Sequence, residues 1–192
     1  MLKRLYDWSM DRVARPSGEK WLAGLSFAEA SFFPIPPDIL LMPMIIADRS
    51  RAWRLALIAT IASVIGAGLG YLIGHFLYEA VALPLIELYG YAEKFSAFEA
   101  YYAEYGVLIV LIGGLTPIPF KVITIASGVA GLDPLLFMLS CIPARAPRFF
   151  AEALLLWKFG PPIRAFVEKR LSLVFTLFVA LLIGGFVALK FV

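Results

Sequence analysis

The sequence has few charged residues and almost no cysteine or histidine. Only 16% of its 192 residues are charged, whereas soluble domains are about 25% charged. Cys141 is the single cysteine and His75 the single histidine. A lone cysteine excludes an internal disulfide and a cysteine-based metal site, and one histidine is too few for a histidine-based metal centre. We therefore expect no metal and no cofactor.

Other patterns are missing as well. The formal charge of +3 is mild, and the sequence has no Lys/Arg-rich block, so nucleic acid is not an expected partner. It contains neither H-E-x-x-H nor G-x-S-x-G, so we expect no enzyme of those classes. An acidic pair of Glu29 and Asp38 is the one catalytic arrangement left open. Residues 1–20 carry charges throughout, unlike a cleavable signal peptide.

Hydrophobic residues are abundant instead. They make up 61% of the chain, and the mean hydropathy is +0.87. Such a composition cannot cover a globule with polar surface, so the bilayer is the expected solvent. A spanning helix needs about 20 residues, which leaves little room for a separate soluble domain. The sequence thus predicts an all-α integral membrane protein with a single membrane domain over residues 1–192.

The apolar pattern divides the chain into consecutive segments. Gly66, Gly70 and Gly74 line one face of the cleanest helix, a spacing that lets another helix approach closely. The predicted segments are amphipathic at 1–20, proline-broken at 21–47, spanning at 55–77, amphipathic and extracytoplasmic at 79–104, proline-broken at 105–132, spanning at 134–157 and spanning at 171–189.

The two proline-broken segments resemble each other. "SFFPIPPDIL" at 31–40 aligns without gaps with "GLTPIPFKVI" at 114–123. Proline lacks a backbone N–H and clashes with the preceding turn, so each P-I-P core should break its helix. Broken helices at matching places in two halves indicate a transporter binding site. The predicted hairpin tips are Pro34, Pro36, Pro37, Pro117 and Pro119.

Loop charges predict how these segments meet the bilayer, since basic loops stay in the cytoplasm. Residues 1–20, 49–54 and 158–170 are basic, and 79–104 is rich in glutamate. Every loop has the expected sign only if both proline-broken segments enter the membrane and return. We therefore predict two re-entrant hairpins of opposite orientation plus about three spans, with a cytoplasmic N-terminus. The tips of this inverted repeat should meet at a central polar cavity.

Ionisable side chains fall inside the apolar segments, where each costs about 3 kcal/mol on insertion scales. Asp38 and Lys121 occupy matching places in the repeat and are expected to face each other or share the cavity. Arg148 and Glu152 are spaced to pair on one helical face, while Glu29 is within reach of Arg145 only across the fold. The candidate substrate- and proton-binding residues are Glu29, Asp38, Lys121, Arg145 and Arg148.

Two stretches, FAEASFFPIPPDILLMP at 27–43 and GGLTPIPFKVITIASGVAG at 113–131, resemble the paired motifs of the DedA family, and more narrowly its YqaA-like branch. The resemblance implies a bacterial inner-membrane protein of two re-entrant hairpins and additional spans, involved in proton-dependent lipid translocation. It implies that Glu29 and Asp38 match the family's functional acids and that Lys121 stands near a functional arginine. A Gly-Arg pair common in the family is Gly113–Gly114 here.

The leading hypothesis is a translocator for an anionic lipid headgroup such as undecaprenyl phosphate or a phospholipid. Lys121, Arg145 and Arg148 would neutralise the phosphate, and Glu29 and Asp38 would exchange protons. An ion or small-solute transporter on the same scaffold is the alternative. A purely structural membrane protein would leave the intramembrane charges unexplained. Expected partners are membrane lipids and protons, with a homo-oligomer left open.

Overall fold

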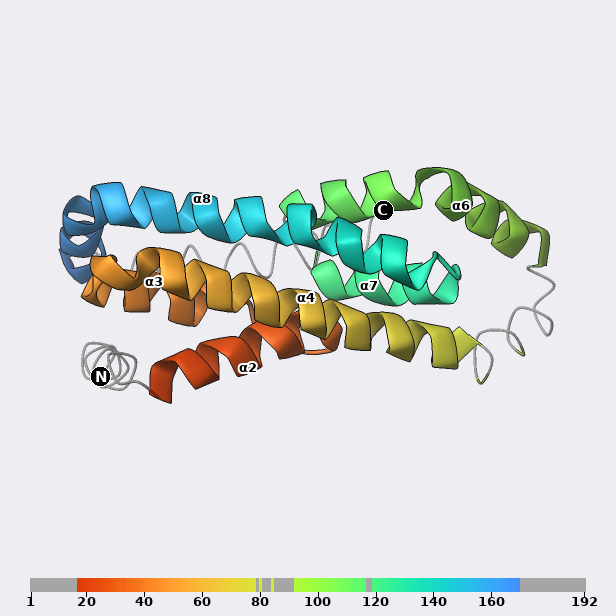
Figure 1. Ribbon diagram of the computed structural model, residues 1–192, viewed down its shortest axis with the longest axis horizontal. Coiled ribbons are helices and arrows are strands. Elements are labelled where there is room, and N and C mark those ends of the chain that lie inside the picture. Colours follow the sequence, from red (N-terminus) through yellow and green to blue (C-terminus); the bar gives the residue numbers. More distant parts are fainter. Residues whose placement is uncertain (1–16, 79, 81–83, 85–91, 117–118, 170–192) are drawn as a thin grey trace.

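A computed structural model describes residues 17–78, 80, 84, 92–116 and 119–169. All regular structure in these residues is helical, which confirms the expected all-α class. In Figure 1 the helices form an elongated bundle, with α4 and α8 running along its length. The elements are α2 (Ser17–Ser31), α3 (Asp38–Ala47), the short 3-10 helix η1 (Arg49–Arg51), α4 (Ala52–Leu77), α6 (Ala92–Leu115), α7 (Phe120–Val129) and α8 (Pro134–Lys169).

Among the described residues, two helices are long and apolar enough to cross a membrane. One runs over Arg49–Leu77 and contains the predicted span 55–77. The other, Phe95–Leu115, extends across the predicted boundary between 79–104 and 105–132; that the first segment is extracytoplasmic and the second re-entrant stays a prediction. No proline interrupts residues 92–115, and glutamate is a good helix former, so α6 continues through that boundary.

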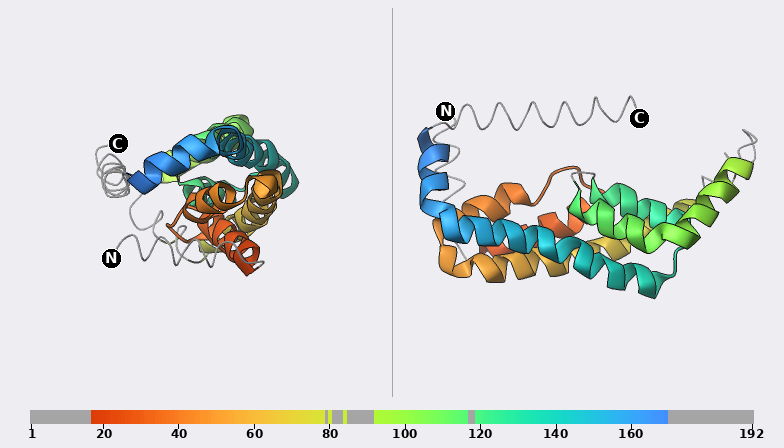
Figure 2. Two further views of the ribbon diagram at one scale, coloured as in Figure 1. Left: turned by 90° about the vertical axis from the view of Figure 1, so that its left-hand side faces the viewer. Right: turned by 90° about the horizontal axis from the view of Figure 1, so that it is seen from above.

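Some predicted segments extend beyond the described residues. The predicted span 171–189 lies outside them, as does most of the amphipathic segment 1–20. The predicted span 134–157 lies within α8, which continues to Lys169. The final turns of α8 bend away from its longer part (Figure 2). The helix contains several prolines, and a proline inside a helix removes a hydrogen bond and favours a kink.

Both proline motifs interrupt the helices. Residues 32–37 separate α2 from α3 and contain Pro34, Pro36 and Pro37, and residues 116–119 separate α6 from α7. Pro119 directly precedes α7, while Pro117 lies outside the described residues. After each break the chain doubles back along the bundle, α3 against the direction of α2 and α7 against that of α6 (Figure 1). That these units dip into a membrane as an inverted repeat stays a prediction.

The two breaks approach each other midway along the bundle (Figure 2). The hydroxyl of Thr124 on α7 donates to the carbonyl oxygen of Ala30, at the end of α2, over 2.9 Å. Ser31 donates to the carbonyl oxygen of Gly66 on α4 over 2.8 Å. These bonds fix the end of α2 against both α4 and α7, so the region where the helices break has defined neighbours.

Glycines allow α4 to pack directly on neighbouring backbones. A Cβ on Gly66 would lie 2.1 Å from the carbonyl oxygen of Phe27, and a Cβ on Gly74 would lie 2.0 Å from that of Ile125. Both distances are shorter than any real carbon–oxygen contact. The predicted close-packing face of this helix is therefore confirmed, with α2 and α7 as the two helices that use it.

A glycine with a positive φ forms the turn from α7 into α8. Gly131 has a φ of +66°, which favours glycine because it has no Cβ. The amides of Leu132 and Gly131 bond to the carbonyl oxygens of Ser127 and Gly128, the pattern of a Schellman C-cap. Asp133 then accepts from the amide of Leu136 over 2.7 Å and caps the start of α8. Local sequence thus determines where α7 ends and α8 begins.

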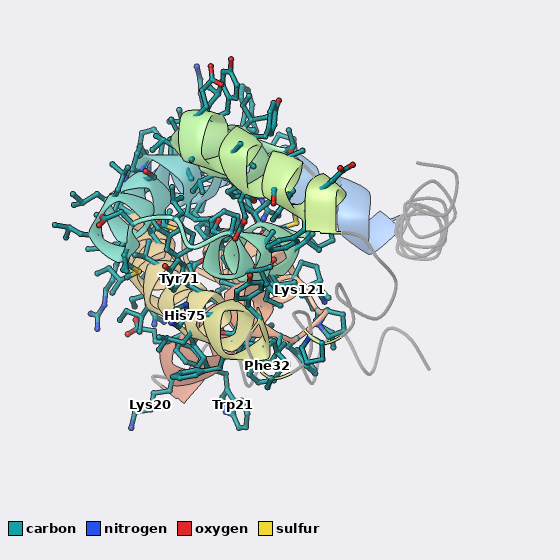
Figure 3. All side chains as sticks on the ribbon, turned by 90° about the vertical axis from the view of Figure 1, so that its right-hand side faces the viewer. Lys20, Trp21, Phe32, Tyr71, His75 and Lys121 are labelled. Atoms are coloured by element: carbon teal, nitrogen blue, oxygen red, sulfur yellow. The ribbon has the colours of Figure 1, made fainter. Side chains whose placement is uncertain are left out.

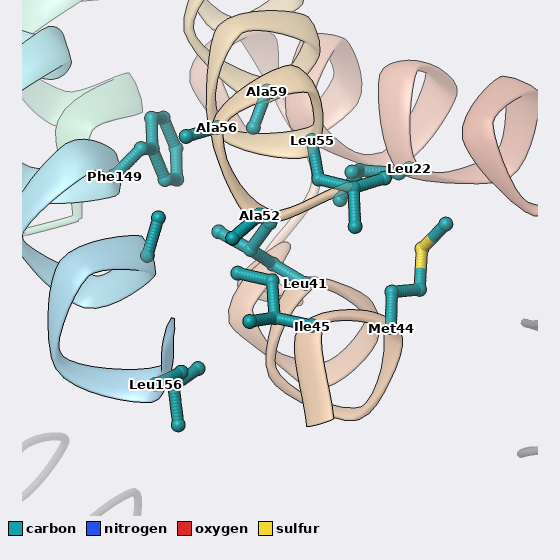
Figure 4. Close-up of a cluster of buried hydrophobic side chains, with 11 residues drawn as sticks. Leu22, Leu41, Met44, Ile45, Ala52, Leu55, Ala56, Ala59, Phe149 and Leu156 are labelled. Atoms are coloured by element: carbon teal, nitrogen blue, oxygen red, sulfur yellow. The ribbon is translucent and has the colours of Figure 1, made fainter. Parts of the chain in front are cut away.

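Apolar side chains pack inside the bundle and also cover its outside. One core cluster joins α2, α3, α4 and α8 through residues such as Leu22, Leu41, Leu55 and Phe149 (Figure 4). Viewed along the bundle, side chains project outward on every side (Figure 3). Many of the outward ones are large and apolar, which suits a lipid-facing surface; they include Trp21, Ile65, Leu108, Ile112, Leu139 and Leu155.

Replacing Gly74 with alanine should destabilise the bundle, because the new Cβ would fall 2.0 Å from a backbone oxygen of α7. Overpacking of this kind costs about 1–3 kcal/mol, so the thermal unfolding midpoint in detergent should fall. Gly24→Ala is the matched control, since nothing lies within 4 Å of its added Cβ. Equal midpoints for the two variants would contradict the packing of α4 on α7.

Candidate functional site

A buried ion pair lies at the centre of the bundle. Arg145 on α8 donates from Nη2 to Oε2 of Glu29 on α2 over 2.8 Å, and the two side chains are only 2% and 10% exposed. The predicted contact across the fold is therefore present. A buried charge is retained only when it is paired and hydrogen-bonded, so each of these residues requires the other.

Further contacts hold the Arg145 guanidinium on its other sides. Its Nε donates to the hydroxyl of Ser63 on α4 over 2.8 Å. Its central carbon lies 4.7 Å from the ring centroid of Phe120 on α7 and 4.8 Å from that of Phe149, within the range of cation–π attraction. One side chain thus connects α8 to α2, α4 and α7, which gives Arg145 a fixed position and leaves it little freedom to bind anything else.

A second ion pair lies one helical turn further along α8. Arg148 donates from Nη2 to Oδ2 of Asp38, the first residue of α3 after the proline break. The side chains are 30% and 22% exposed, far more than those of the Arg145 pair. The sequence suggested that Arg148 pairs with Glu152, but Arg148 forms its ion pair with Asp38 instead. The first break brings Asp38 to α8, where it accepts from Arg148 instead.

Glu152 completes this second cluster. It stands one turn beyond Arg148 on α8, and Arg148 contacts Asp38, so both acids lie beside the same base. Oδ1 of Asp38 and Oε1 of Glu152 are both buried, and neither has a hydrogen-bond partner within the described residues. The arrangement therefore consists of two acids and one base, Asp38, Glu152 and Arg148, whereas the deeper pair has one acid and one base.

Lys121 lies apart from these ion pairs. It is the second residue of α7 and directly follows Phe120, whose ring stacks on Arg145. Asp38 forms its ion pair with Arg148 on α8, and that Lys121 shares a cavity with Asp38 stays a prediction. Lys121 forms no salt bridge in the part of the chain that the structure describes. It stands beside the second break, at the end of the helix where backbone amides favour an anion.

Sequence reasoning missed three residues that hold the site together. Ser63, Phe120 and Phe149 all contact Arg145, and none is ionisable. One signal was available for Phe149, which is four residues beyond Arg145 and so on the same helical face. Ser63 lies 82 residues from Arg145, and no local pattern reveals that contact.

Within the residues that the structure describes, no metal site competes with this arrangement. The described residues contain no group of three or more His, Cys, Asp or Glu side chains that would hold a metal. A mostly apolar pocket of about 350 Å³ lies between α4 and the start of α8. None of the predicted site residues lines it; its lining residues are Gly68, Tyr71, Leu72, His75, Pro134, Phe137 and Met138.

Basic and aromatic residues gather at the end of the bundle that holds η1. Arg51 and Arg54 donate to the two carboxylate oxygens of Glu19 over 2.5 Å and 2.9 Å. The rings of Trp53 and Trp157 lie 6.2 Å apart. Tryptophan and basic side chains at one level are typical of a membrane interface. The hydrogen bond from Arg51 holds the pKa of Glu19 below its usual value.

Comparisons with known proteins agree with the motifs. A family model described as the VTT domain matches residues 35–158, which include Asp38, Lys121, Arg145, Arg148 and Glu152, while Glu29 precedes the match. An uncharacterized protein of Haemophilus influenzae is 33% identical over 190 residues, which cover 99% of this chain and 96% of that protein.

Two further relatives are also described as uncharacterized. One from Histophilus somni is 32% identical over 168 residues, covering 85% of this chain and 87% of the relative. One from Methanocaldococcus jannaschii is 34% identical over 100 residues, covering 52% and 59%. No solved structure matches the chain.

Replacing Arg145 with leucine should cost about 3–5 kcal/mol of unfolding free energy, because Glu29 would remain as an uncompensated buried charge. Denaturant unfolding in detergent measures this loss. Arg54→Ala is the control. It breaks an ion pair whose arginine is 70% exposed, and such surface pairs contribute about 0–1 kcal/mol. A double variant, Glu29→Met with Arg145→Met, should recover most of the loss. Similar losses for Arg145→Leu and Arg54→Ala would contradict the central role of the buried pair.

The lowered pKa of Glu19 predicts a pH-dependent contribution to stability. A carboxyl group with a depressed folded-state pKa stabilises the fold above its unfolded pKa, about 4.3. That contribution is lost as the pH falls through the folded-state pKa. Unfolding midpoints of wild type and Glu19→Gln should differ near neutral pH and converge in acid. A difference that stays constant down to about pH 3 would show that the ion pairs of Glu19 do not stabilise the fold.

Proposed function

We propose, from the premise that the chain belongs to the VTT-domain family of DedA-type membrane proteins, that it translocates lipids with an anionic headgroup. Members of this family are membrane proteins, and the two apolar helices Arg49–Leu77 and Phe95–Leu115 suit a bilayer. Undecaprenyl phosphate or a phospholipid is the proposed substrate class, and envelope homeostasis the proposed role. The proposed location is the bacterial cytoplasmic membrane, with the N-terminus in the cytoplasm.

The observation that carries this proposal is the half-buried ion pair of Arg148 and Asp38 beside the first break. Arg148 is 30% exposed while it pairs with Asp38, so its guanidinium group is within reach of a ligand. Guanidinium binds phosphate with two parallel hydrogen bonds, as it binds carboxylate. A headgroup phosphate therefore fits as a competitor of Asp38 for Arg148, and the exchange would replace one anion with another.

Arg145 takes a different role in this proposal. It is 2% exposed, and Glu29, Ser63, Phe120 and Phe149 already contact it. We therefore assign it to positioning the helices around the site and not to phosphate binding. Lys121 remains the second candidate base, because it stands at the start of α7 beside the second break. The Gly-Arg pair common in the family is Gly113–Gly114 in this chain. Arg148 on α8 would supply the guanidinium group that this pair lacks.

The surroundings of the site suit an amphipathic substrate. The backbone at 32–37 is non-helical, and such backbone is tolerated at membrane depth only where protein or water covers it. Phe32, Phe33 and Ile35 beside it are exposed. A lipid would keep its chains against this apolar outer surface while its headgroup passes the polar groups of Arg148 and Asp38.

A headgroup-resolved translocation assay in proteoliposomes tests the proposal. Wild-type protein should move an anionic lipid. Arg148→Gln should reduce the rate about ten- to a hundredfold, because a hydrogen bond to a charged group contributes about 1.5–3 kcal/mol. Asp38→Asn and Lys121→Ala should also lose transport. Arg54→Ala is the matched control, since it removes an equal charge from a side chain that is 70% exposed and pairs with Glu19, and it should leave the rate unchanged.

The outcomes separate the candidate functions. Full activity in Arg148→Gln would rule out this site. Movement of no lipid by folded wild-type protein would overturn lipid translocation and favour the alternative, a proton-coupled transporter of ions or small solutes. Equal movement of anionic and neutral lipids would retain translocation but remove the phosphate as the recognised group.

A further inference from the structure

Glu152 is a charged residue of α8 to which the proposed mechanism assigns no role. It lies one helical turn beyond Arg148, on the same helical face. The motif match with the family does not single it out. Because Arg148 contacts Asp38, Glu152 nevertheless stands beside the half-buried ion pair.

Counting charges shows that this cluster is unbalanced. Glu29 and Arg145 cancel each other in the deeper pair. Around Arg148 there are two acids, Asp38 and Glu152, and one base. If both acids were ionised, the cluster would carry one uncompensated negative charge. A like charge nearby disfavours ionisation of a carboxyl group, and burial of an unpaired charge is costly.

The cluster also lacks a hydrogen-bond donor. Oδ2 of Asp38 accepts from Arg148, but Oδ1 of Asp38 and Oε1 of Glu152 are buried and have no donor among the described residues. Two carboxylates close together cannot donate to each other. A single proton between the two carboxyl groups would supply the missing donor and cancel the excess charge.

We propose that Asp38 and Glu152 share one proton and that Glu152 is thereby a proton-binding residue of the transport site. Other charged groups near the cluster do not supply this proton. Arg145 on α8 lies near Arg148 and Asp38, and Glu29 from α2 is held by Arg145 in the deeper pair. Cys141, which lies near Arg145, is buried as well.

The shared proton suggests how lipid and proton movements are coupled, a consequence that rests on the proposed function. A singly charged phosphate that takes Arg148 from Asp38 adds one negative charge to a neutral cluster. Uptake of a second proton restores neutrality and leaves both acids uncharged. One proton would then accompany each headgroup, entering when the phosphate binds and leaving when it departs.

Infrared spectroscopy of the full-length protein in liposomes tests the shared proton without any transport. Wild type should show the carbonyl band of a protonated, buried carboxylic acid near neutral pH. Glu152→Gln should lose the band, because the new amide donates to Asp38 and removes the need for a proton. Asp38→Asn should lose it for the same reason. Glu19→Gln is the control and should keep the band, because its ion pair lies at the other end of α2.

Absence of the band from wild type, or its persistence in both Glu152→Gln and Asp38→Asn, would overturn the proposal. Thermal unfolding midpoints check that the variants fold. If one variant does not fold, the other alone tests the proposal. In the translocation assay, Glu152→Gln should abolish the response to a pH gradient. If the band behaves as expected but wild type moves no lipid, the proton site stands and lipid translocation fails. If wild type moves lipid but its carbonyl band is absent, or the band persists in both variants, translocation stands and the proton site fails.

Discussion

The guanidinium group of Arg145 is the point on which the rest of the bundle depends. It is almost completely buried, and it is stabilised only because Glu29, Ser63 and two aromatic rings surround it. Those partners belong to α2, α4, α7 and α8, so the charge can be satisfied only when the four helices are assembled. A membrane interior makes this requirement stricter, since an unpaired charge there has no water to bind. The same contact therefore provides both stability and correct relative placement of the two proline breaks.

The two arginines of the site lie on the same helix but differ in how far their side chains are exposed. Arg145 and Arg148 are separated by less than one turn of α8, yet the first is 2% exposed and the second 30%. The difference arises from what faces them. Arg145 points at the end of α2, while Arg148 reaches Asp38 at the start of α3, where the chain has just left the break. Under the proposed function, a ligand would exchange at the accessible pair of Arg148 while the packing around Arg145 stays intact.

Sequence reasoning was strongest where the cause is local. Proline restricts the backbone wherever it stands, so the break at 32–37 could be located from sequence, as could the glycine face of α4. The predicted boundary between residues 104 and 105 falls inside α6, because the glutamates suggested a separate surface segment, whereas they also sustain a helix. Partner choice was least predictable. Arg148 pairs with a residue 110 positions away, not with Glu152 on its own helix, because the doubling back of the chain decides which acid is nearer.

A high-resolution structure in nanodiscs of anionic lipid tests the central claim most directly, namely that the exposed pair receives the headgroup while the buried pair stays intact. It should be determined at acid and at neutral pH. The account predicts a headgroup phosphate against Arg148 in acid, with Asp38 displaced and the contact between Arg145 and Glu29 unchanged. Headgroups confined to the membrane interface, with Arg148 still bound to Asp38 at both pH values, would contradict it.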